Sequence, residues 1–173
     1  MRRIHTVNFM SETCLITGAT GMVGALLVEE ALQRGMQVRT IARPTSDTGH
    51  LESVGAEIHR GQLTDVDFVR GTMQGVDYVF HCAAKVGDWG PIEDYRTVNV
   101  EALRSMLEVC RQIQVKRFVH LGSLGVYPAE HHYGSDETYP LPEKHMDAYT
   151  QTKLEAEKLV LQFHQEHQLP IVV

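Results

Sequence analysis

The chain has 173 residues, of which 43% are apolar and 22% charged, and it carries a formal net charge of -6. Its length and composition are those of one soluble globular domain that is large enough to bury a core. A net negative chain lacks the clustered Lys and Arg that nucleic acids and anionic membranes recruit, so both are excluded as expected partners. We expect a small-molecule substrate instead.

The amino-terminal residues predict a short flexible extension. Arg2 and Arg3 are not followed by an apolar stretch, so neither a signal peptide nor a membrane anchor is indicated. Met10 stands just ahead of the first apolar run. We therefore expect residues 1–12 to form an extension and residues 13–173 to form one domain.

Three cysteines lie inside apolar runs and lack the spacing of metal ligands: Cys14, Cys82 and Cys110. Thiols of this kind are usually buried and unpaired in a reducing compartment. Together with the missing targeting signal, they predict a cytoplasmic protein.

Short apolar runs alternate with helical stretches along the whole chain. This alternation predicts an α/β fold, a doubly wound parallel sheet with helices on both faces, known as the Rossmann fold. A first helix over residues 22–34 is ended by Gly35, and two longer helices are expected over about 92–113 and 147–167. The predicted strands cover residues 14–17, 37–42, 56–60, 76–81 and 116–121, with a last strand that begins near residue 169.

The last predicted strand runs to Val173, and an apolar strand with a free end would be a poor terminus. We therefore expect the chain to be the N-terminal part of a longer protein, with the substrate subdomain absent or truncated.

A long polar loop is predicted over residues 127–145, on the carboxyl side of the fifth strand. Ligands of such sheets bind outside the carboxyl ends of the strands, so this loop is expected near the site. It contains His131, His132 and His145, but no further carboxylate or cysteine pattern accompanies them. Surface histidines are the preferred interpretation, and no metal is expected.

A glycine-rich turn joins the first predicted strand to the first predicted helix. Gly18, Gly21 and Gly24 leave the backbone free to turn tightly, to approach a diphosphate and to pack the helix on the strand. The helix amino terminus then offers unpaired N–H groups to the anion. The position of the turn favours a dinucleotide site, and a purely structural turn is the alternative.

The residue after the second strand bears on the choice of cofactor. NAD sites usually carry an acid there, which binds the ribose hydroxyls. This chain has Ala42 followed by Arg43, and a cation suits a 2′-phosphate. NADP is therefore the expected cofactor, with NAD as the alternative and a solvated surface arginine as the simpler interpretation of Arg43.

Tyr149 and Lys153 are the catalytic candidates. Their four-residue spacing on a predicted helix places phenol and ammonium on one face. A tyrosine has an ordinary pKa of about 10, and a nearby ammonium would lower it toward the range of a useful base. Ser123, just past the fifth strand, is placed to hydrogen-bond a substrate oxygen. A chance spacing on an ordinary helix is the alternative for the Tyr-Lys pair.

Three shorter elements accompany these motifs: Gly61-Gln62-Leu63 after the third strand, His81-Cys82-Ala83-Ala84 after the fourth, and Asn99-Val100 in the next helix. In this order the motifs resemble the extended short-chain dehydrogenase/reductase superfamily, which includes sugar-nucleotide epimerases and dehydratases, dihydroflavonol reductases and 3β-hydroxysteroid dehydrogenases. The last two groups are the branch that residues 85–90 and 131–137 most resemble. The chain departs from the superfamily pattern at Gln62, where an aspartate is usual, and at Gly122, where many relatives have a second serine.

The resemblance implies catalytic roles for Ser123, Tyr149 and Lys153. With the arguments above, it implies that the cofactor is bound by Gly18, Thr20, Gly21, Met22, Val23, Gly24, Arg43, Gln62, Leu63, Cys82, Ala83, Ala84, Asn99, Tyr149 and Lys153. Dimerisation through the two long helices is common in the superfamily and is carried over as an expectation of a homodimer.

The motifs together predict an NAD(P)-dependent oxidoreductase that interconverts a secondary alcohol and a ketone by hydride transfer with a Ser-Tyr-Lys triad. One alternative is a sugar-nucleotide epimerase or dehydratase that keeps its dinucleotide tightly bound. A second alternative is a non-catalytic NADP-binding redox sensor.

Overall fold

The computed structural model describes residues 12–173 apart from Asp88, Ala129 and Glu137. In this part of the chain, six parallel strands form one sheet in the order β3-β2-β1-β4-β5-β6. The strand order reverses between β1 and β4, and ligands bind at such a reversal in doubly wound sheets. The predicted Rossmann fold is confirmed. The strands are β1 (Thr13–Thr17), β2 (Gln37–Ala42), β3 (Glu57–Arg60), β4 (Tyr78–His81), β5 (Arg117–His120) and β6 (Ile171–Val172).

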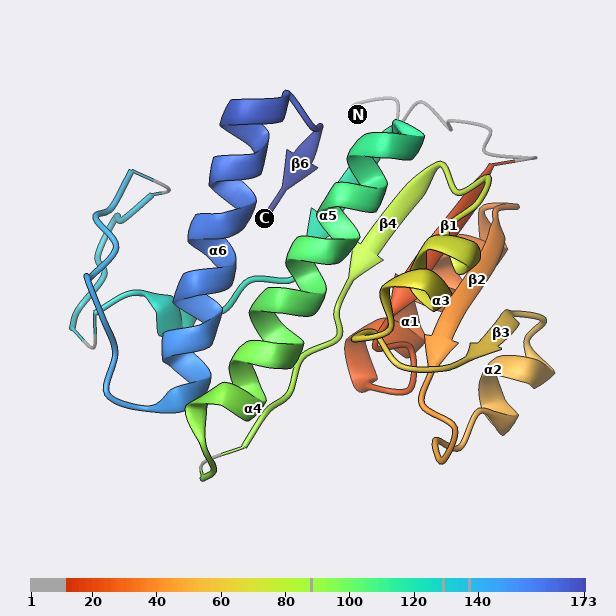
Figure 1. Ribbon diagram of the computed structural model, residues 1–173, viewed down its shortest axis with the longest axis horizontal. Coiled ribbons are helices and arrows are strands. Elements are labelled where there is room, and N and C mark those ends of the chain that lie inside the picture. Colours follow the sequence, from red (N-terminus) through yellow and green to blue (C-terminus); the bar gives the residue numbers. More distant parts are fainter. Residues whose placement is uncertain (1–11, 88, 129, 137) are drawn as a thin grey trace.

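Helices cover both faces of this sheet. They are α1 (Met22–Gln33), α2 (Gly49–Ser53), α3 (Val66–Thr72), α4 (Ile92–Arg96), the π-helical turn η1 (Thr97–Glu101), α5 (Ala102–Ile113), the 3₁₀ turn η2 (Leu124–Val126) and α6 (Ala148–His167). Figure 1 shows α5 and α6 running side by side across one face, and the two helices contact each other directly. The strand arrows of β2, β4 and β6 point toward the lower part of the view, where α6 begins.

Side chains of the central strand alternate between two apolar cores. Leu15 packs into the core formed with α3, α5 and α6. Cys14 and Ile16 pack into the opposite core, formed with α1 and α2. All three side chains are fully buried. Burial on both faces explains why β1 is a continuous apolar run rather than an alternating one.

The stretch predicted as one helix over about 92–113 is instead interrupted. A π-helical turn at Thr97–Glu101 separates α4 from α5, and it buries Asn99 and Val100. Such turns insert one extra residue per turn, which re-aims the following side chains, and they are frequent at functional sites. Helical periodicity alone does not reveal them.

Two short helices, α2 and α3, were not predicted from the sequence. They contain five and seven residues, too few for a clear helical period. A local signal was present for α3, because Asp65 is its N-cap and accepts a hydrogen bond from the Phe68 amide at 3.0 Å.

The predicted extension lies outside the described residues except for its last member, Glu12. The carbonyl of Glu12 accepts a hydrogen bond from the Gln37 amide at 2.9 Å. Its carboxylate pairs with Lys116 at 2.6 Å, which raises the pKa of that amine. Glu12 therefore belongs to the folded sheet, at the edge opposite the candidate site.

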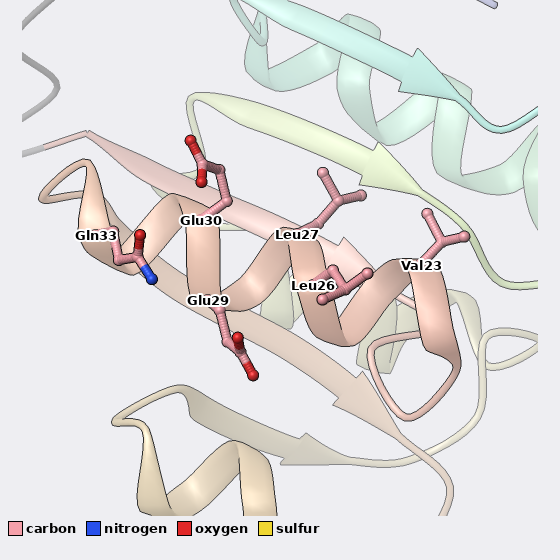
Figure 2. A pocket seen from close by; sticks show the side chains of 6 residues that line it. All are labelled: Val23, Leu26, Leu27, Glu29, Glu30 and Gln33. Carbon is pink, nitrogen blue, oxygen red and sulfur yellow. The ribbon is translucent and has the colours of Figure 1, made fainter.

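A shallow hollow lies along the outer side of α1 (Figure 2). Its apolar end is formed by Val23, Leu26 and Leu27, and Glu29, Glu30 and Gln33 form its polar end. Of the side chains predicted to bind the cofactor, it includes Val23 alone. Among the described residues, no helix is both long enough and apolar enough to cross a bilayer.

Candidate functional site

The glycine turn brings the end of β1, the start of α1 and the end of β4 into backbone contact. Gly18 has a φ of 71°, and a Cβ there would lie 2.7 Å from the backbone nitrogen of Ala83. A Cβ at Gly24 would lie 2.3 Å from the Gly18 carbonyl oxygen. The Gly21 amide donates to that same oxygen at 2.9 Å. Neighbouring backbone therefore excludes side chains at Gly18 and Gly24.

The first turn of α1 has the features that a dinucleotide diphosphate needs. Its N-cap, Gly21, makes no side-chain capping bond, and no acidic residue lies in the first turn. Thr20, Met22 and Val23 are exposed around it. Unpaired N–H groups and the positive end of the helix dipole attract a phosphate group. The residues present therefore fit a dinucleotide.

The residues predicted near the adenosine half of the cofactor lie at the carboxyl ends of β2 and β3. Arg43 follows β2, is exposed, and forms no ion pair with any described residue. The Gly61 amide donates to the Ala42 carbonyl at 3.0 Å, which holds the two strand ends together. Gln62 is exposed, whereas Leu63 is half-buried and packs against the main core.

The segment after β4 lies against the glycine turn. The Ala83 amide donates to the Thr17 hydroxyl at 3.3 Å. Cys82, Ala83 and Ala84 are all half-buried, so small side chains line this part of the edge. Burial raises the pKa of the Cys82 thiol and keeps it protonated.

The prediction of buried free thiols is confirmed at Cys14 and Cys110. Burial raises the pKa of both, to about 12 for Cys14. The prediction is wrong about the degree of burial at Cys82, which is only half-buried in the segment after β4.

Lys153 is buried in the second turn of α6, with only 4% of its surface exposed. Its Nζ donates to the Leu121 carbonyl, directly after β5, at 2.6 Å. Removal from water lowers the pKa of this ammonium, and the charge of Glu157 opposes that effect. A charged side chain in such a place requires partners, because burying an unpaired charge is costly.

The turn η2, whose N-cap is Ser123, packs on α6, whose first turn contains Tyr149. A Cβ at Gly125 would lie 2.6 Å from the Thr150 methyl group, so the two turns are in close contact. The Ser123 hydroxyl oxygen accepts a bond from the Gly125 amide at 3.2 Å, which leaves its own proton free to be donated. Tyr149 is half-buried, and its hydroxyl hydrogen-bonds no described residue. The predicted catalytic residues therefore share the edge that carries the glycine turn.

Asn99 links the segment after β4 to α6. Its Oδ1 accepts from the Lys85 amide at 2.7 Å, and its Nδ2 donates to the Lys85 carbonyl at 3.0 Å. The same Nδ2 donates to the Thr152 hydroxyl at 3.1 Å, next to Lys153. Asn99 thus positions two segments of the site, while its predicted cofactor contact stays a prediction. Sequence reasoning did not assign Lys85 or Thr152 a role in the site, because their link through Asn99 depends on how the segment after β4 packs on α6.

A row of polar side chains lies in register across three strands beneath Lys153. Thr17, His81 and His120 are paired in register across β1, β4 and β5, and all three are buried. The Thr17 hydroxyl and His81 Nδ1 are 2.9 Å apart, and the two imidazoles stack at 5.6 Å. Neither ring nitrogen of His120 has a hydrogen-bond partner among the described residues. This row was not predicted, because it depends on the strand register.

Burial lowers the pKa of His81 to about 3. It lowers that of His120 to about 2, with the charges of His81 and Lys153 adding to the effect. Both rings are therefore neutral at physiological pH and bring no charge to Lys153.

Two of the three loop histidines, His131 and His132, are surface groups as expected, and His145 is not. His131 and His132 are exposed, and the His132 ring contacts the Pro128 carbonyl at 2.8 Å. His145 is half-buried, with its Nε2 at 2.9 Å from the Val126 carbonyl, so it ties the end of the loop to η2.

Comparison with known proteins decides the family. The model of the NAD dependent epimerase/dehydratase family matches residues 14–173, nearly the whole chain. This chain belongs to that family. Membership agrees with the glycine turn and strand order, and it confirms the resemblance to the extended short-chain dehydrogenase/reductase superfamily.

Similar curated proteins include reductases and dehydrogenases. A 3β-hydroxysteroid dehydrogenase/Δ5→4-isomerase of Mycobacterium tuberculosis is 34% identical over 172 residues, covering 93% of this chain and 46% of that protein. A putative dihydroflavonol 4-reductase of Synechocystis is 33% identical over 168 residues, covering 95% of this chain and 48% of that protein. The chain thus spans about half the length of these relatives.

Solved structures of similar proteins superpose closely. A UDP-glucuronic acid 4-epimerase from Bacillus cereus in complex with NAD has a TM-score of 0.77 and 29% identity, with 92% of this chain and 54% of that chain covered. A short-chain dehydrogenase/reductase superfamily protein from Agrobacterium tumefaciens with bound NAD has a TM-score of 0.79 and 30% identity, with 93% and 48% covered.

Proposed function

We propose that this chain is the cofactor-binding part of an NADP-preferring oxidoreductase that interconverts a secondary alcohol and a ketone. The observation that carries the proposal is the shared edge of Tyr149, Lys153 and Ser123 with the glycine turn. Lys153 donates a hydrogen bond to the carbonyl of Leu121, the residue after β5. The charge of Lys153 also acts to lower the pKa of His81 and of Cys82, at the end of β4. The end of β4 contacts Gly18 in turn. One continuous edge thus joins the proposed base to the proposed diphosphate site.

Each side chain would have a distinct role in this reaction. A bound nicotinamide dinucleotide would supply the hydride donor or acceptor. The Tyr149 hydroxyl would exchange a proton with the substrate oxygen, and the Lys153 ammonium would stabilise the phenolate by its charge. The Ser123 hydroxyl would donate a hydrogen bond to the same substrate oxygen. The reductases and dehydrogenases among the similar proteins support this reaction class.

Replacing Tyr149 by Phe tests the proposal. In protein expressed from the complete gene, we expect turnover to fall about 10²- to 10⁴-fold, the usual contribution of a general acid or base. The dissociation constant for NADP should stay within about twofold, because the ring is retained. Steady-state kinetics and fluorescence titration with NADPH measure the two effects. Tyr133→Phe, an exposed loop tyrosine, is the control. Undiminished turnover in Tyr149→Phe would refute the proposed role.

The preference for NADP rests on Arg43. Its exposed guanidinium, free of any described ion pair, lies at the end of β2, where a ribose phosphate would bind. We expect Arg43→Ala to weaken NADP binding about tenfold and to leave NAD binding nearly unchanged. Isothermal titration with each cofactor provides the measurement. Arg117→Ala, an exposed arginine at the amino end of β5, is the control. Equal losses for both cofactors would argue against 2′-phosphate recognition.

A sugar-nucleotide epimerase or dehydratase is the second candidate, and the structural likeness to a UDP-glucuronic acid 4-epimerase favours it. Such an enzyme would retain its dinucleotide through the cycle. Purified protein that carries a tightly held dinucleotide, and that consumes no added NADPH while converting substrate, would support this candidate. NADP binding without turnover of any alcohol or ketone tested would support a redox sensor instead.

A further inference from the structure

Glu157 lies on the face of α6 that also carries two of the proposed catalytic residues. Tyr149, Lys153 and Glu157 are spaced four residues apart, so they lie on one face of this helix. Glu157 is half-buried, and it forms no ion pair or hydrogen bond with any described residue. Burial raises the pKa of its carboxyl, and the positive charge of Lys153 opposes that effect. The half-buried carboxylate of Glu157 therefore lies close to the site and is not engaged by another described side chain.

The backbone at the end of β5 makes room for this carboxylate. A Cβ on Gly122 would lie 3.5 Å from Oε2 of Glu157, so the acid lies directly against a residue that has no side chain. The preceding carbonyl, that of Leu121, accepts the hydrogen bond from Lys153. The two side chains of α6 therefore converge on adjacent residues of the same strand end, one charged positively and the other negatively.

The groups packed around Lys153 bring no other negative charge. The neutral imidazoles of His81 and His120 approach it from β4 and β5, and the Cys82 thiol is kept protonated by burial. Tyr149 lies one turn earlier on α6. Lys153 forms no ion pair with a described residue, and it donates a hydrogen bond to a neutral carbonyl, that of Leu121. Cys82 as a thiolate would also raise the pKa of Lys153, but burial keeps that thiol protonated at neutral pH, so Glu157 is the counter-charge available to this ammonium there.

We propose that Glu157 is a positioning residue that keeps the buried Lys153 ammonium charged and directed at the end of β5. This proposal rests on the proposed function. The charge on Lys153 matters for catalysis because only a charged Lys153 would stabilise a Tyr149 phenolate. Glu157 lies beyond direct ion-pair distance and acts through its field across the Leu121–Gly122 backbone. In this partly buried place the field is less screened by water than at the surface.

The experiment measures the titration of Lys153 in Glu157→Gln, which removes the charge and keeps the shape. NMR of lysine labelled with ¹³C and ¹⁵N, in protein expressed from the complete gene and assigned with Lys153→Arg, gives the pKa of the amine without turnover. We expect this pKa to fall by about one pH unit relative to the wild type. Alcohol oxidation should then begin to decline at correspondingly lower pH, because the amine loses its proton sooner.

Glu155→Gln is the matched control. Glu155 lies two residues earlier on α6, and its carboxylate bonds Arg96 at 2.8 Å instead of facing Lys153. We expect this variant to lose thermal stability and to leave the Lys153 titration unchanged. An unchanged titration in Glu157→Gln, or an equal shift in both variants, would overturn the proposal. If Glu157→Gln does not fold, Glu157→Asp and Glu157→Asn provide the same charge comparison at equal length.

The two proposals fail in different ways. If the pKa of Lys153 is the same in Glu157→Gln as in the wild type, Glu157 does not have the proposed role, whatever the reaction is. Full activity of Tyr149→Phe with an intact titration shift removes the reaction mechanism and leaves the counter-charge in place.

Discussion

Replacing Gly24 by alanine is expected to lower the free energy of unfolding by about 3 kcal/mol, because the added methyl group has no space. A Cβ at Gly24 would lie 2.3 Å from the Gly18 carbonyl oxygen and 2.8 Å from the Ala19 Cα. Both are backbone atoms, so no side chain can rotate away. The helix α1 would have to separate from β1, and the turn that would hold the diphosphate would open. We therefore expect NADP binding to be lost along with stability.

Urea denaturation of the wild type and of Gly24→Ala measures the change in the free energy of unfolding, and Gly71→Ala is the control. Gly71 lies in α3, and a Cβ there would meet nothing within 4 Å. Alanine in a helix is favoured over glycine, so the control should be more stable by about 0.5–1 kcal/mol. If alanine lowers the free energy of unfolding at Gly24 and raises it at Gly71, the cost at Gly24 is steric. Wild-type stability in Gly24→Ala would contradict the packing described.

The second large effect is a loss of stability in acid caused by His81 and His120. Burial lowers their pKa values to about 3 and about 2 in the folded protein. An unfolded histidine has a pKa of about 6.5, so below that pH the unfolded state binds more protons than the folded state. Folding stability should therefore fall as the pH decreases from about 6.5 toward 3. At pH 4 the loss is on the order of 3 kcal/mol for each imidazole.

His120→Phe tests this prediction with a ring of similar size. It removes two buried nitrogens that have no hydrogen-bond partner among the described residues. We expect the variant to lose about 3 kcal/mol less than the wild type between pH 7 and pH 4, as measured by urea denaturation at each pH. His131→Gln, at an exposed loop position, should follow the wild-type curve. Parallel curves for all three proteins would show that the buried rings do not control acid stability.

Local patterns in the sequence were enough to predict most of the fold. The strand β1 was predicted as a short continuous apolar run and the helix α1 as an amphipathic stretch, and the glycine-rich turn between them marks where one ends and the other begins. The π-turn around Asn99 was not predicted, since an inserted residue in a helix leaves no mark on composition. The helices α2 and α3 were missed because they are short.

The candidate site divides in the same way. The spacing of Tyr149 and Lys153, and that of Gly18, Gly21 and Gly24, places each group on its own local element, so the sequence by itself determined the family and the two halves of the candidate site. Only the tertiary structure decided that Lys153 is buried above His81 and His120, and that Glu157 lies against Gly122. The physical reason is that these neighbours are set by strand register and by the packing of α6 on the sheet, which join residues far apart in the chain.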